Sequence, residues 1–130
     1  MADETHEKIE TFAQFWDFYV GEHKDKNTRL LHFIGTTLAI SCVAGGLLTR
    51  KRWLLLLAPI CGYGPAWFSH FFVEKNKPAS FTYPLWSLRA DLVMWWKTIR
   101  GEMQAEVDRV TQGQAVEAEP VPVVADQAVN

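Results

Sequence analysis

Two long apolar windows dominate the chain, and each is long enough to form a membrane-spanning helix. The windows cover residues 30–49 and 53–73, and neither contains Asp, Glu, Lys or Arg. About 20 residues of α-helix extend roughly 30 Å, which is the thickness of the hydrocarbon core of a bilayer. The three basic residues between the windows leave room only for a tight turn, so the pattern predicts an antiparallel helical hairpin. Pro and Gly residues in the middle of the second window predict a kink or a break near residues 62–65, with Pro65 opening a second helical piece.

Amphipathic segments flank this predicted hairpin. Apolar residues recur at helical spacing between Lys8 and Val20 and predict a helix that Gly21 ends. Residues 74–84 read as a loop, and residues 86–109 predict a second amphipathic helix, with Trp95 and Trp96 at the level of the lipid headgroups. Residues 112–130 have no aromatic residue and no periodicity, which is typical of a disordered tail. We therefore expect one helical domain over residues 1–111 and a tail over 112–130.

The predicted fold class is all-α: a small helical membrane protein whose transmembrane hairpin is flanked by amphipathic N- and C-terminal helices. The alternative is a soluble bundle whose two central helices are buried on all sides. Uncharged runs of this length favour the membrane protein. Six basic residues flank the terminal side of the hairpin and three lie in its turn, which favours cytoplasmic termini. The expected location is the endoplasmic reticulum in a eukaryote or the inner membrane in a bacterium.

Charge excludes one class of partner and leaves others open. The net charge is −2 and the isoelectric point is about 6.1, so the chain has no basic field with which to bind nucleic acid. Membrane lipid is an expected partner, and a homo-oligomer is left open. The two cysteines, Cys42 and Cys61, have no zinc-site spacing and are expected to lie at similar depth in the hairpin as inert thiols.

Three of the four histidines are expected to meet at one end of the hairpin. If the hairpin turns at Lys51, residues whose numbers sum to 102 lie at the same depth, and His32 and His70 satisfy this condition. His23 precedes the first window and falls on the same face. The polar residues Glu74, Asn76 and Asp91 are expected there too. His6 lies in the polar start of the chain and is set aside.

Imidazoles and carboxylates in one layer suggest a metal site. Two histidines and one carboxylate with open positions form the typical arrangement of non-haem Fe(II) enzymes. Two other interpretations remain open. In the first, the histidines are satisfied polar groups at helix ends of a non-enzymatic membrane protein that docks a partner. In the second, His32 and His70 are the axial ligands of a haem.

Two stretches of sequence carry a resemblance to a known family. They are FYVGEHKDKNTRLLHFIGT (Phe18–Thr36) and GYGPAWFSHFFVEKNKPASFTYPLWSLRADLVMW (Gly62–Trp95). Polar residues agree at many fixed spacings over about residues 10–100. The shared positions are Tyr19, His23, Asn27, His32, Gly35, His70, Glu74, Asn76, Pro78, Ala79, Pro84, Ser87 and Asp91. This pattern resembles the family of the yeast 2-hydroxy-palmitic acid dioxygenase, a family of small membrane proteins.

The resemblance implies an Fe²⁺-dependent dioxygenase that uses dioxygen to shorten a 2-hydroxy fatty acid by one carbon, an α-oxidation step in sphingoid-base breakdown. The implied catalytic residues are His23, His32, His70 and Glu74. The three histidines would bind the iron, and Glu74 or Asp91 would supply a carboxylate ligand or orient one. Asn27 and Asn76 would be hydrogen-bonding supports.

Overall fold

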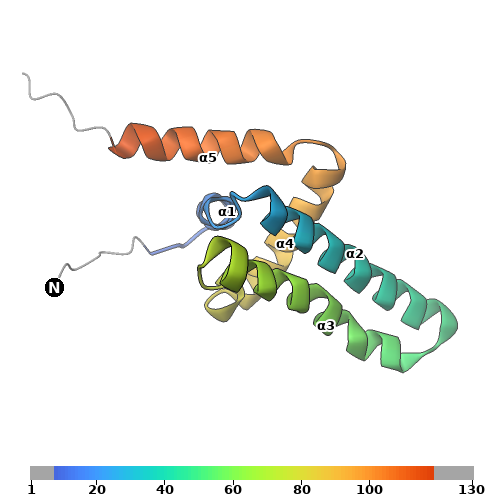
Figure 1. Cartoon of the computed structure of the whole chain (residues 1–130). Helices are drawn as coiled ribbons and strands as arrows, with labels where there is room; N and C mark the ends of the chain where they lie inside the picture. The colour runs from blue at the N-terminus through green and yellow to red at the C-terminus, as the bar shows by residue number, and fades with distance from the viewer. Residues whose placement is uncertain (1–7, 119–130) are drawn as a thin grey trace, which may run out of the picture.

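A computed structural model describes residues 8–118, and this part of the chain contains helices and no strand (Figure 1). The predicted all-α class is therefore confirmed. In chain order the elements are α1 (Phe12–Gly21), α2 (Lys26–Thr49), α3 (Arg52–Ser69), the π-helix η1 (His70–Glu74), the 3-10 helix η2 (Ala79–Phe81), α4 (Pro84–Ile99) and α5 (Met103–Ala118).

Helix α1 begins and ends close to where the apolar spacing predicts. Thr11 caps it, because its hydroxyl accepts a hydrogen bond from the backbone of Gln14 while the Gln14 side chain bonds back to the backbone of Thr11. Such a reciprocal cap satisfies backbone donors that the first turn of a helix leaves free. The predicted apolar stripe is the face that α1 buries, and it comprises Phe15, Trp16, Tyr19 and Val20.

Helices α2 and α3 lie side by side, joined by a tight turn in which Arg50 adopts a left-handed conformation with φ of 58° (Figure 1). Gly35 permits their close approach. A Cβ atom there would lie 2.9 Å from the carbonyl oxygen of Gly62 and 3.0 Å from that of Cys61. The Cys61 carbonyl has no helical donor because Pro65 lacks an N–H group. Because Gly35 has no side chain, the backbone of α2 packs directly on the backbone of α3 at these two carbonyl groups.

The second window has no break near residues 62–65, which was one of the two predicted outcomes there. Helix α3 runs without interruption from Arg52 to Ser69, with Pro59 and Pro65 inside it. Packing against α2 along the helix outweighs the hydrogen bonds that the two prolines remove. The irregular backbone lies later instead, in η1, which follows α3 directly and ends at Lys75 with φ of 56°.

The C-terminal helical segment also differs from the prediction. Residues 86–109 form parts of two helices, because Gly101 takes φ of 71° and turns the chain between α4 and α5. Helix α5 continues to Ala118, so residues 112–118, predicted as tail, are helical. The remainder of the predicted tail, residues 119–130, lies outside the described residues.

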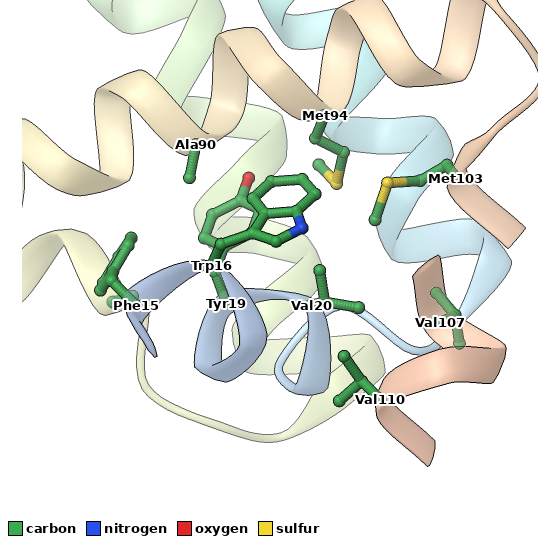
Figure 2. Packing of buried hydrophobic residues seen from close by; sticks show 10 residues of the cluster. Phe15, Trp16, Tyr19, Val20, Ala90, Met94, Met103, Val107 and Val110 are labelled. Carbon is green, nitrogen blue, oxygen red and sulfur yellow. The ribbon is translucent and has the colours of Figure 1, made fainter. Parts of the chain in front are cut away.

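The apolar core lies among α1, α4 and α5, at the end of the α2–α3 pair opposite its turn (Figures 1 and 2). Its side chains come from α1, from the start of η2, and from one face each of α4 and α5. They are Phe15, Trp16, Tyr19, Val20, Ala79, Ala90, Met94, Met103, Val107 and Val110. The three short helices therefore form a packed cap over the open end of the helix pair.

A polar network ties α5 to this cap. Glu106 accepts hydrogen bonds from Arg109, from the Trp16 indole at 3.2 Å and from Lys97 at 3.1 Å, and Arg109 also pairs with Asp17 at 2.6 Å. Hydrogen bonds, the strongest of them from Arg109, lower the pKa of Glu106 to about 2. Glu106 is therefore ionised throughout the physiological range and fixes the position of α5 against α1 and α4.

The outer faces of α2 and α3 are apolar and exposed. Within this chain only 22% of the apolar window of α2 is buried, so α2 is not covered on all sides by the other described helices. By length and composition, α2 is the one helix in residues 8–118 that could cross a membrane; a signal sequence or the core helix of a soluble protein can meet the same criterion. The second predicted span is not a single α-helix, because α3 gives way to η1 at His70.

Candidate metal centre

Three buried histidines meet at the open end of the helix pair. His23 lies in the connector between α1 and α2, His32 lies in the second turn of α2, and His70 is the first residue of η1. Their ring centroids are 4.5–5.0 Å apart and the rings are nearly perpendicular to one another. Each is at most 3% exposed. The convergence predicted from hairpin register is therefore present in the structure.

Backbone carbonyls fix the orientation and the tautomer of two of these rings. His23 Nδ1–H donates to the carbonyl oxygen of Tyr19 at 2.6 Å, and His32 Nδ1–H donates to that of Thr28 at 2.8 Å. A carbonyl oxygen only accepts, so the proton must reside on Nδ1 and the lone pair on Nε2. In both cases the acceptor lies four residues earlier, within one helical turn. Sequence analysis did not identify Tyr19 or Thr28 in this role, although the four-residue spacing before each histidine was visible.

The Asn76 side chain fixes the orientation and the tautomer of the third ring, that of His70. His70 Nδ1–H donates to Asn76 Oδ1 at 2.7 Å, and Asn76 Nδ2 donates to the carbonyl oxygen of Glu22 at 3.2 Å. The amide therefore holds the ring on one side and the α1–α2 connector on the other. The backbone of η1 makes this possible, because the Asn76 N–H returns to the carbonyl oxygen of His70 at 2.9 Å. The expected supporting role of Asn76 thus has a direct geometric basis.

The arrangement leaves Nε2 acceptors facing one another without a proton between them. His23 Nε2 and His32 Nε2 are 3.1 Å apart, and the potential ligand atoms of all three histidines lie within 4.8 Å of one another. Two lone pairs at such a distance repel unless a cation lies between them. Two ligands at right angles on a metal with bonds of about 2.1 Å would be about 3.0 Å apart. The His23–His32 pair therefore has the spacing of two ligands on one transition metal that accepts neutral imidazole, such as iron or zinc, and His70 is a third donor close by.

Burial keeps His23 in the neutral form that a metal requires. Removal from water, with further contributions from His32 and His70, holds the pKa of His23 well below its usual range. Arg29 adds to this effect and also fixes the connector: its guanidinium donates to the carbonyl oxygen of His23 at 2.9 Å and to Gln104 Oε1 at 2.9 Å.

Two predicted site residues lie away from the cluster. Glu74 Oε1 accepts the backbone N–H of Asp25 at 2.8 Å and so braces the start of α2. Glu74 follows His70 by four residues within η1, but its carboxylate bonds to Asp25 and is not part of the histidine cluster. Asn27 is exposed in the first turn of α2, where its backbone N–H bonds to Asp25 Oδ1. Among the described residues, the cluster itself contains histidines and no carboxylate.

Asp91 lies beside the cluster rather than in it. It accepts a hydrogen bond from the Tyr19 hydroxyl, and the Tyr19 ring stacks on His23 with centroids 3.9 Å apart. Burial raises the pKa of Asp91 to about 6. Tyr19 thus contacts His23 through its ring, holds the imidazole through its carbonyl group and positions Asp91 through its hydroxyl. The structure gives Asp91 an outer position, which was one of its two predicted roles.

A small polar cavity and a long apolar groove adjoin the histidines. The cavity has a volume of about 10 Å³ and is lined by the three histidines, Asp91 and Ser87, among others. The buried Ser87 hydroxyl has no hydrogen-bond partner among the described residues. Such a cavity holds about one water molecule. It cannot hold a porphyrin, so the haem interpretation does not fit.

Comparison with known proteins identifies the family. A family model described as 2-hydroxy-palmitic acid dioxygenase Mpo1-like matches residues 9–103, a range that contains the three histidines, Asn76 and Asp91. No curated protein and no solved structure matches the chain. The match covers most of the sequence and all of the site described above. The chain belongs to the 2-hydroxy-palmitic acid dioxygenase Mpo1-like family.

Proposed function

We propose that this protein is an Fe(II)-dependent dioxygenase that shortens 2-hydroxy fatty acids by one carbon. The observation that carries the proposal is the convergence of three neutral, buried imidazoles whose Nδ1 atoms are all bonded to oxygen. The family description supplies the class of reaction.

The donor set suits this chemistry. His23, His32 and His70 would hold the iron and leave other coordination positions open, as an oxygen-activating site requires. Iron bound there would supply the activation of dioxygen and the exchange of electrons with the substrate. The hydroxyl and carboxylate oxygens of a 2-hydroxy acid match a metal site with more than one open position. The overall conversion balances: one dioxygen is consumed, the carboxyl carbon leaves as carbon dioxide, the neighbouring carbon becomes the new carboxyl group, and one water forms.

The residues around the histidines would bind and protect the polar end of the substrate. The unpartnered Ser87 hydroxyl can donate to a substrate oxygen that enters the cavity. Tyr19 and Asp91 also line this cavity, and the Tyr19 ring stacks on His23 and holds it in place. The burial of all three imidazoles excludes bulk water from the reacting end of the substrate.

The exposed apolar surface supports a membrane location for this activity. Large apolar side chains on the outer faces of α2 and α3 form a surface that lipid would cover. Among the most exposed are Leu48, Trp53, Leu56 and Ile60. Helix α4 adds an exposed apolar face with Trp96, which suits the interface between lipid and water. We place the histidine end and both termini on the cytoplasmic side, of the endoplasmic reticulum in a eukaryote or the inner membrane in a bacterium.

The test is anaerobic purification of the full chain, metal analysis, and incubation with 2-hydroxyhexadecanoic acid and dioxygen. We expect bound iron and a product one carbon shorter. His23→Ala, His32→Ala and His70→Ala should each lose most of the metal and all turnover, whereas His6→Ala, in the part of the chain outside the described residues, should change neither. Iron retained in all three variants would refute the site. Zinc in place of iron, with no turnover, would retain the metal site and refute the dioxygenase.

A further inference from the structure

A long apolar groove starts at the histidine cluster and follows the α2–α3 pair toward its turn. Its volume is about 630 Å³, within the usual range for sites that bind small molecules. Beyond the cluster its walls are formed mainly by apolar side chains, including Val43, Ala44, Leu47, Leu55, Ala58 and Pro59. Asp91 is the one Asp, Glu, Lys or Arg among its lining residues, and it lies at the end where His32 lies.

The groove adjoins the small cavity at the metal centre. Four residues line both spaces: His32, Tyr63, Ala66 and Asp91. A ligand with an apolar arm in the groove would therefore have its polar end at His32 and Asp91, beside the other two histidines. This polarity, with one polar end and one long apolar arm, is that of a fatty acid.

The length of the groove also fits a single acyl chain. His32 and Leu47 are 15 residues apart on one helix (47 − 32 = 15), which corresponds to about 22 Å. One leaflet of a bilayer is about 15 Å of hydrocarbon, the depth that ordinary membrane acyl chains fill. The groove is therefore long enough for an extended long-chain fatty acid but offers space for only one.

We propose that this groove binds the acyl chain of the substrate, with the 2-hydroxy acid at the histidines and the terminal methyl group near Leu47 and Leu55, and that groove depth selects chain length. This inference rests on the proposed function only for the identity of the polar group that lies at the histidines. In a membrane the acyl chain leaves lipid rather than water, so burial contributes little affinity and the shape of the groove provides the selectivity.

An activity experiment tests the selectivity. Ala44 is exposed toward the groove 12 residues after His32 (44 − 32 = 12), so Ala44→Phe should fill its far part without disturbing the fold. We expect kcat/KM for 2-hydroxyoctadecanoic acid to fall about tenfold or more, with 2-hydroxydecanoic acid unaffected. Gly64→Phe is the matched control, because Gly64 is exposed, does not line the groove and has no neighbour within 4 Å of an added Cβ. Equal losses for both acids in Ala44→Phe would contradict the proposal.

A binding experiment separates this inference from the proposed function. The full chain in lipid nanodiscs is irradiated with 2-hydroxyoctadecanoic acid that carries a diazirine at its terminal carbon, and the labelled residues are mapped. We expect labels at residues 43–47 and at Leu55, and their loss in Ala44→Phe. Labels spread over the outward-facing Leu48 and Leu56 would refute the groove, whatever the turnover. Labels in the groove without turnover would uphold the groove and refute the proposed reaction.

Discussion

Asn76 provides a direct test of how the chain orients a metal ligand. Its Oδ1 accepts the Nδ1–H of His70 at 2.7 Å and its Nδ2 donates to the Glu22 carbonyl oxygen at 3.2 Å. Asn76 Nδ2 also donates to Glu22 Oε2 at 2.5 Å. Asn76→Leu keeps the approximate size of the side chain and removes all three side-chain hydrogen bonds. Groups that hold a metal-binding histidine by its second nitrogen typically contribute 10–100-fold to metal affinity, or about 1.4–2.7 kcal/mol. We expect the metal affinity of Asn76→Leu to fall by that factor.

A second variant separates the contact of Asn76 with His70 from its two contacts with Glu22. Asn76→Asp keeps an acceptor for His70 but replaces the donor to Glu22 with a negative charge close to the Glu22 carboxylate. We expect Asn76→Asp to keep most of its metal affinity and to unfold more readily. Adding Glu22→Gln to Asn76→Asp should restore part of that stability, because it removes the opposing charge.

Metal affinity is measured on the full chain by competition with a chelator under anaerobic conditions, and stability by thermal unfolding of the same samples. Asn27→Leu is the control, because Asn27 is the other asparagine in the shared pattern and its side chain is exposed. It should match the wild type in both measurements. An Asn76→Leu variant that binds metal as tightly as the wild type would refute the orienting role and weaken the assignment of His70 as a ligand.

Three further predictions concern the scaffold. Gly35→Ala places a methyl group 2.9 Å from a backbone carbonyl oxygen of α3 and should destabilise the protein by about 1–3 kcal/mol in thermal unfolding, whereas Gly64→Ala, in open space, should not destabilise through any such overlap. Hydrogen bonds hold the pKa of Glu106 at about 2, below its value of about 4.5 in the unfolded chain, so its stabilising contribution is complete above pH 4.5 and lost as the pH falls toward 2. Glu106→Gln should therefore remove about 1 kcal/mol at neutral pH and flatten acid unfolding in that range; an unchanged acid-unfolding profile would contradict this role. Cys42 and Cys61 contact each other through their thiols across α2 and α3, so we expect a membrane-permeant oxidant to cross-link them within one chain. We expect water-soluble thiol reagents to label both cysteines slowly in intact membranes. Rapid labelling without detergent would argue against membrane burial.

Hydrophobic pattern and register along the chain were sufficient for part of this site. Helical periodicity located α1 and its buried face, and two uncharged windows separated by a short basic turn predicted two neighbouring helices. The sum rule about Lys51 then placed His32 and His70 at one depth, and their rings are 5.0 Å apart. These inferences succeed because depth in an antiparallel pair depends only on the number of residues from the turn.

The partners of the histidines could not be predicted in the same way. Glu74 was expected in the same layer as the histidines, but its carboxylate bonds to the backbone of Asp25, and Asn76 is the residue that holds His70. Similarly, one left-handed glycine, Gly101, divides the expected C-terminal helix in two and lets α5 return to pack on α1.

The sequence by itself therefore determined the all-helical class, the family and the level at which three histidines meet. Only the tertiary structure decided which nitrogen of each imidazole is free, because that depends on an oxygen acceptor within hydrogen-bond distance of Nδ1. It also decided that Asp91 lies outside the cluster and that an apolar groove opens from the cluster along α2 and α3. The physical reason is that periodicity fixes the face and the depth of a residue, whereas its contacts depend on how whole helices rotate and how closely they approach. In this protein Gly35, η1 and the packed cap of α1, α4 and α5 together set that rotation and approach.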